Sequence, residues 1–120
     1  MASDIGIERV DDYLQITYTG PFSLEGARRT VDAMVSACAR ERLAKVLLDC
    51  RSMTGGLSVI SRFDMAQYGA STIPHSIRVA VLGRPDQMLP DRFFENAARN
   101  RGLMVTLFTA IDEAIEWLEG

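Results

Sequence analysis

The segment from Val46 to Cys50 constrains the fold most, because it is apolar at almost every position and carries its one carboxylate, Asp49, near the end. A strand of this kind, predicted over residues 43–50, is typical of the centre of a parallel sheet that helices cover on both faces. The small, hydroxyl-rich residues that follow, Ser52 to Ser58, predict a loop that leads into a helix. Because open α/β sheets bind ligands at the carboxyl ends of their strands, this loop is the first candidate for a functional site.

Hydrophobic periodicity predicts four further strands, over residues 5–10, 13–19, 77–82 and 103–108. The acidic pair Asp11-Asp12 suggests a hairpin between the first two. Helices are predicted after the cap Ser23, over residues 57–70, from Pro90 to Gly102, and after a capping box formed by Thr109 and Asp112. The apolar stripe of the first helix is Leu24, Ala27, Val31, Met34 and Cys38.

The resulting order is β-β-α-β-α-β-α-β-α. It predicts an α/β fold with a mixed, mostly parallel sheet, an N-terminal β-hairpin and four helices. A chain of 120 residues without linkers or repeats is expected to form one domain over residues 1–120.

Composition excludes several classes of function. The net charge of −3 argues against a nucleic-acid partner. No apolar run is long enough for a membrane span, and polar residues between Ser3 and Arg9 interrupt any signal peptide, so a cytoplasmic protein is expected. Cys38 and Cys50 make no disulfide framework and are expected to be small buried hydrophobes.

No catalytic residues, cofactor or metal site are predicted, so the chain is not expected to be an enzyme. His75 is the only histidine and has no metal-ligand spacing. Asp49 could be a ligand or a general base, although no His or second carboxylate partners it in the sequence, or it could hold loop N–H groups in place.

The candidate binding residues come from two loops at the same predicted sheet edge. Backbone N–H groups of the first loop could hold an anion, or a hydroxyl of Thr54 or Ser58 could simply cap the following helix. Arg84 could face that loop, or form a turn beside Asp86. The candidate binding residues are Asp49, Ser52, Thr54, Gly55, Gly56, Ser58, Gly83 and Arg84.

Two further alternatives stay open. Met53 and the pair Met88-Leu89 either fill the core or line an apolar surface near the predicted site. Trp117 either docks the last helix on the sheet or marks a dimer contact.

Four stretches in this order resemble the STAS domain, and most closely the small SpoIIAA-like branch grouped as STAS/SEC14-like. They are Val46-Leu47-Leu48-Asp49 with its loop and helix, Arg78-Val79-Ala80-Val81-Leu82-Gly83, Val105-Thr106-Leu107-Phe108-Thr109, and Glu113-Ala114-Ile115-Glu116-Trp117-Leu118. In anti-sigma-factor antagonists of this type the loop carries a phosphorylatable Ser in an Asp-Ser-Ser-Gly type run. Here the aligned positions are Met53-Thr54-Gly55-Gly56-Leu57, which lack the Asp.

The resemblance implies a non-enzymatic regulatory or protein-interaction module, with Thr54 and Ser58 as candidate phospho-acceptors. The alternative is a module that binds a small apolar or anionic ligand at the carboxyl edge of the sheet. A homodimer is also expected as a partner arrangement, because the N-terminal hairpin leaves an exposed edge strand.

Overall fold

The computed structural model describes residues 4–55, 59–87, 99 and 102–120. Its five strands form one sheet in the order β1-β2-β3-β4-β5. The strands are β1 (Asp4–Val10), β2 (Tyr13–Pro21), β3 (Lys45–Thr54), β4 (Arg78–Leu82) and β5 (Met104–Phe108). β1 and β2 are antiparallel, and the other neighbouring pairs are parallel. The mixed, mostly parallel sheet with an N-terminal hairpin is therefore confirmed.

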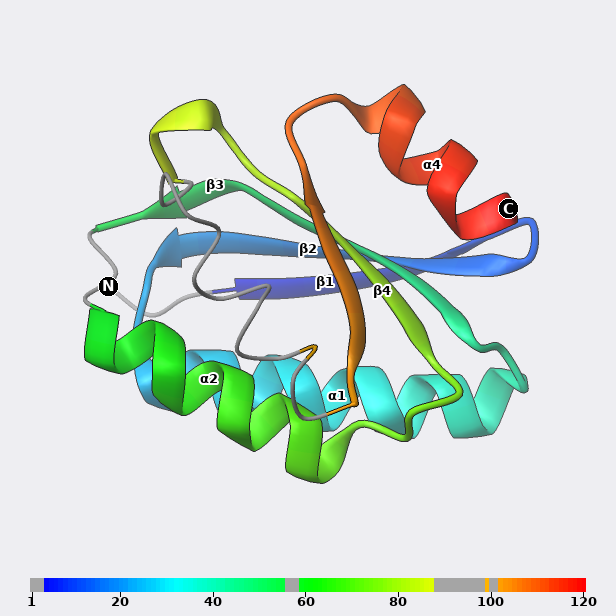
Figure 1. Cartoon of the computed structure of the whole chain (residues 1–120), viewed down its shortest axis with the longest axis horizontal. Coiled ribbons are helices and arrows are strands. Elements are labelled where there is room, and N and C mark those ends of the chain that lie inside the picture. Colours follow the sequence, from blue (N-terminus) through cyan, green and yellow to red (C-terminus); the bar gives the residue numbers. More distant parts are fainter. Residues whose placement is uncertain (1–3, 56–58, 88–98, 100–101) are drawn as a thin grey trace.

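The helices lie on both faces of this sheet. They are α1 (Leu24–Glu41), α2 (Val59–Thr72) and α4 (Ile111–Glu119), with a short 3₁₀ helix η1 (Pro85–Gln87). Figure 1 shows α1 and α2 side by side along one face, while α4 packs on the other. The pair Met88-Leu89 and most of the third predicted helix, from Pro90 to residue 98, lie outside the described residues.

Local sequence explains how the first three elements form. Asp11 adopts a φ of +53°, which lets the chain reverse between β1 and β2. The Ser23 hydroxyl caps α1 by accepting a hydrogen bond from the Gly26 N–H at 2.9 Å. The predicted stripe of α1 is buried from Ala27 onward, at Val31, Met34 and Cys38.

Two apolar clusters, one on each face, make β3 the centre of the molecule. Val46 faces the cluster that includes Leu14 and Met34, whereas Leu47 faces the cluster that includes Ala114 and Leu118. Val46 and Leu47 are both 0% exposed. A strand that buries both of its faces needs the continuous apolar run found in this sequence.

A predicted strand end and a predicted helix cap are wrong. β3 continues to Thr54 instead of ending at Cys50, because it pairs in parallel with the end of β2, where Pro21 lies opposite Thr54. The N-cap residue of α4 is Ala110, which makes no side-chain capping bond, so Thr109 and Asp112 form no capping box. Burial of Ala114 and Leu118 against the sheet holds this helix, and such packing outweighs a terminal hydroxyl.

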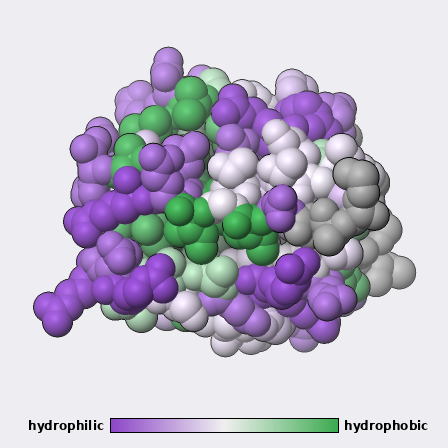
Figure 2. Space-filling view, turned by 180° about the vertical axis from the view of Figure 1, so that it is seen from behind, coloured by the Kyte–Doolittle hydropathy of each residue, from purple (hydrophilic) through white to green (hydrophobic). Residues whose placement is uncertain are grey.

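The edges of the sheet are β1 and β5. Ile7 on β1 is 40% exposed. The face opposite to that of Figure 1 is mostly polar, with apolar side chains gathered at its centre and to the left of it (Figure 2). At the other edge, Arg99 donates from Nε to the carbonyl oxygen of Val105 at 2.9 Å. This side chain satisfies an edge carbonyl that would otherwise be open to another strand.

Candidate functional site

The carboxyl ends of β3 and β4 bring the two predicted loops together. Asp49 lies opposite Leu82 in the parallel register, so Gly83 and Arg84 emerge beside the last residues of β3. The Gly83 N–H donates to the carbonyl of Phe108 at 2.9 Å, which ties this turn to β5 as well. The site therefore rests on three adjacent strands rather than on loops alone.

Asp49 is a buried carboxylate that is fully engaged by Arg51. Asp49 is 7% exposed. Its Oδ1 accepts hydrogen bonds from the Arg51 backbone N–H at 3.0 Å and from the Arg51 Nε at 3.1 Å, and its Oδ2 accepts from Nη2 at 2.9 Å. Burial opposes ionisation, but the side-chain and backbone hydrogen bonds from Arg51 outweigh it and lower the pKa of Asp49. Asp49 therefore stays ionised and is unsuited to act as a general base near neutral pH.

Sequence patterns did not single out Arg51. Tyr18 on β2 faces two residues of β3, Cys50 and Arg51, because the register shifts between Thr17 and Thr19. Such a β-bulge re-aims the side chains beside it. The signal in the sequence was the opposite charge of Asp49 and Arg51 two positions apart, because alternate residues of a strand can share a face.

Arg84 ties the turn after β4 to the end of β3. Its Nη1 donates to the carbonyl oxygen of Met53 at 3.2 Å and also to the carbonyl oxygen of Arg51. Its Nε donates to the Asp86 Oδ1 at 3.1 Å. We call these contacts the Arg84 clasp. Arg84 thus lies against the end of β3 and pairs with Asp86 at the same time, while its role as a binding residue stays a prediction.

The first loop is shorter than predicted. Ser52, Met53 and Thr54 belong to β3, and the Thr54 carbonyl accepts a hydrogen bond from the Phe22 N–H at 2.9 Å. Thr54 therefore does not cap the following helix, which begins at Val59. Gly55 has a φ of +86°, which favours glycine at this exit from the strand. Gly56 and Ser58 lie outside the described residues.

The side chains along the end of β3 separate into two environments. Met53 is buried at 8% exposure, which places it in the core rather than on an apolar surface. Ser52 and Thr54 are exposed on either side of it. This edge therefore presents two hydroxyl groups on a strand end that the Arg84 clasp fixes.

The two cysteine thiols are poor nucleophiles near neutral pH, because they stay protonated. Burial raises the pKa of the Cys38 thiol, and burial together with the charge of Asp49 raises the pKa of Cys50 to about 12.

Within the described ranges, no three His, Cys, Asp or Glu side chains gather into a metal site. Among the same residues, no helix is long and apolar enough to cross a membrane. His75 is exposed at the turn before β4.

No family model and no curated protein sequence matches the chain. Similar solved structures do exist. An anti-sigma factor antagonist from Mycobacterium paratuberculosis has a TM-score of 0.67 at 12% identity, covering 99% of this chain and 96% of that one. An uncharacterised DUF3478-family protein with a SpoIIAA-like fold from Shewanella loihica has a TM-score of 0.59 at 25% identity, covering 97% and 93%.

A third similar structure is the anti-sigma factor antagonist SpoIIAA in its unphosphorylated form. It has a TM-score of 0.50 at 14% identity and covers 98% of this chain and 99% of that one. These matches extend over nearly the whole of both chains, so they concern the complete arrangement of the sheet and its helices. The chain has the SpoIIAA-like fold of STAS domains.

Proposed function

We propose that the chain is a non-enzymatic regulatory module that binds a protein partner through the carboxyl edge of its sheet. The proposed contact surface consists of Ser52, Thr54 and Gly55 at the end of β3, with the neighbouring helix α2. Two of the similar structures are anti-sigma factor antagonists, which are regulatory proteins by name. This supports a regulatory role at the level of the fold.

The Arg84 clasp is the observation that carries the proposal. The charged groups at this edge are engaged with one another or with backbone carbonyls, as Asp49 is with Arg51 and Arg84 with Asp86. Groups held in this way have fixed positions and little capacity for proton or group transfer. The exposed hydroxyls on a fixed strand end are suited to recognition by a partner.

Phosphorylation at Thr54 or Ser58 is the proposed means of regulation. A phosphate would add a charge of about −1.5 to −2 at the start of the region that leads into α2. Thr54 follows Met53, whose carbonyl accepts from Arg84. A phosphate on Thr54 would therefore compete for the Arg84 guanidinium and alter the clasp.

Partner capture tests this proposal. Immobilised wild-type protein and the variants T54D and S58D would be incubated with extract of the source cells, and retained proteins quantified by mass spectrometry. S36D is the matched control, because Ser36 is an exposed hydroxyl on α1 and the variant has the same net charge. A partner retained by wild type and S36D but altered at least about tenfold by T54D or S58D supports the proposal. Identical retention by all four proteins argues against it.

Two related predictions remain proposals. A homodimer through β1 would cover an edge strand on which Ile7 is exposed. A ligand at the carboxyl edge would have to displace the contacts that Arg84 already makes, so the described geometry favours a protein partner there.

A further inference from the structure

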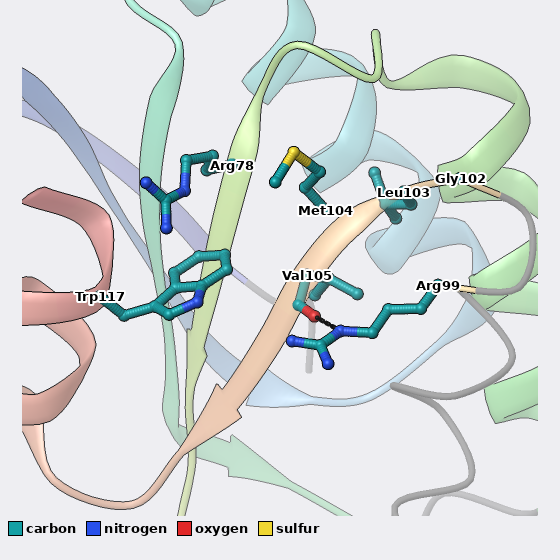
Figure 3. A pocket seen from close by; sticks show the side chains of 7 residues that line it. All are labelled: Arg78, Arg99, Gly102, Leu103, Met104, Val105 and Trp117. Atoms are coloured by element: carbon teal, nitrogen blue, oxygen red, sulfur yellow. Dashed lines mark hydrogen bonds between the residues drawn. The ribbon is translucent and has the colours of Figure 1, made fainter. Parts of the chain in front are cut away.

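A second site is suggested by a pocket at the amino ends of β4 and β5, whereas the Arg84 clasp lies at the carboxyl ends of the strands. The pocket has a volume of about 340 Å³ and lies where β4 and β5 begin and α4 ends. Arg78 starts β4, Met104 starts β5, and Trp117 lies near the end of α4. Figure 3 shows these side chains around the pocket, together with Arg99 on the far side of β5.

Arg78 brings a positive charge to this pocket without a carboxylate partner among the described residues. Its guanidinium carbon lies 4.4 Å from the centre of the Trp117 ring, so a cation–π contact positions it. Its Nε is buried and finds no hydrogen-bond acceptor in the part of the chain that the structure describes. The carboxylate of Asp12 is already paired with Lys45, at 2.9 Å. Lys45 lies opposite Arg78 on β3. Buried donors of this kind are rare in folded proteins and call for an explanation.

Arg99 places a second guanidinium at the rim of the same pocket. Its Nε donates to the Val105 carbonyl oxygen, and its Nη2 donates to the Thr106 hydroxyl oxygen. These contacts hold the side chain against β5. Arg78 and Arg99 both line this small pocket, from opposite sides of β5. Their two positive charges produce a potential that favours an anion, because a pocket with apolar walls focuses the field.

The walls between the two guanidinium groups are apolar. Trp117 is fixed by Phe108, with 5.9 Å between the ring centroids, and its ring lines the pocket. Met104 is 45% exposed, which is unusual for a large apolar side chain, and lines the pocket as well. A flat ring and a thioether are surfaces on which a planar apolar group packs well.

We propose that this pocket binds a small aromatic carboxylate. Its carboxylate would accept hydrogen bonds from Arg78, in the positive potential that Arg99 reinforces, and its ring would pack on Met104 and on the part of the Trp117 ring that Arg78 leaves uncovered. A volume near the lower end of the range of about 300–1,000 Å³ for ligand sites favours a ligand with a single ring. This site is separate from the proposed protein-binding surface, and either proposal can fail without the other.

Trp117 is the only tryptophan in the chain, so its fluorescence reports directly on the pocket. Phenylacetate, used as the probe, is expected to change the emission saturably. R78Q should weaken this binding about tenfold or more, because a charge-assisted hydrogen bond is lost. R28Q is the matched control: it removes the same charge and another arginine–aromatic contact, the one with Tyr68 on the opposite face. It should leave binding within about twofold of wild type.

Three further probes test the ligand class. Phenylacetamide has the same size without the charge, inorganic phosphate has the charge without the ring, and octanoate has a chain instead of the ring. Phenylacetate is expected to bind at least about tenfold more tightly than each of them. Equal binding of phenylacetamide would overturn the role of Arg78, and equal binding of phosphate or octanoate would overturn the aromatic ligand.

A second variant covers the case in which R78Q does not fold. M104E places a carboxylate at an exposed position of the pocket wall, where little packing is lost. Like-charge repulsion should abolish phenylacetate binding while the melting temperature stays near that of wild type. Unchanged binding in folded M104E, or no saturable response in wild type, overturns the proposal.

Discussion

Arg51 binds the carboxylate of Asp49 with both its backbone and its guanidinium, through three hydrogen bonds of 2.9–3.1 Å. The two residues are two positions apart on β3, and Arg51 belongs to the β-bulge opposite Tyr18. Asp49 is nearly covered, whereas the Arg51 side chain is 47% exposed. The contact therefore stabilises the end of β3 and leaves much of the Arg51 side chain in solvent.

D49N should lower the free energy of unfolding by about 1–2 kcal/mol at pH 7. Hydrogen bonds to a charged group contribute up to about 3 kcal/mol, and the exposure of Arg51 reduces this value. The pKa of Asp49 is lowered in the folded state, so its contribution is present above the unfolded pKa and is lost as pH falls. Urea denaturation of both proteins should therefore give curves that converge below about pH 4. A difference that stays constant from pH 7 to pH 3 would contradict this assignment.

R84Q should loosen the end of β3 without unfolding the protein. The Phe22 amide, which donates to the Thr54 carbonyl at 2.9 Å, should exchange its hydrogen about tenfold faster, because the clasp no longer holds Met53. Hydrogen-exchange NMR measures this rate. D86N is the control, since Arg84 keeps its bonds to the carbonyl groups. Equal acceleration in D86N and R84Q would show that the ion pair with Asp86, and not the bonds from Arg84 to the carbonyl groups of β3, fixes the strand.

Much of the fold was predictable because it follows from local patterns. The continuous apolar run at Val46 and Leu47 required a strand covered on both faces, and both residues are fully buried. The three-and-four spacing on α1 identified its buried side, including Met34 and Cys38. These patterns reflect the burial of apolar side chains, which is the main driving force that places a central strand or a packed helix.

The end of β3 was not predictable from the same patterns. Arg51 and Ser52 are polar and exposed, so the chain there has the composition of a loop. It is a strand because it pairs with the end of β2, more than 30 residues earlier in sequence. The Asp49–Arg51 pair and the contact of Arg84 with Met53 depend on this pairing. The residue types at the site could be predicted, but their mutual contacts required the tertiary structure.

The thiols of Cys38 and Cys50 should react slowly in the folded protein. Burial raises both pKa values, and that of Cys50 reaches about 12, with the charge of Asp49 as a smaller cause. At pH 8 a thiol reagent should modify neither residue rapidly in native protein and both in urea, where the pKa is about 8.5. D49N should leave Cys50 slow, because burial is the larger cause. Native modification of Cys50 as fast as in urea would contradict the assignment.

G102A should lower the free energy of unfolding by about 1–3 kcal/mol, for two separable reasons. Gly102 has a φ of +90°, which is strained for any residue with a Cβ. An added Cβ would also lie 2.8 Å from Cε1 of His75, closer than real contacts allow. H75A removes the second cause, so G102A should cost less in an H75A background, and only the strain of the backbone should remain. Thermal or urea denaturation of the four proteins gives this double-mutant cycle. Equal costs in both backgrounds would mean that the His75 ring moves aside freely and that backbone conformation alone requires glycine at this position.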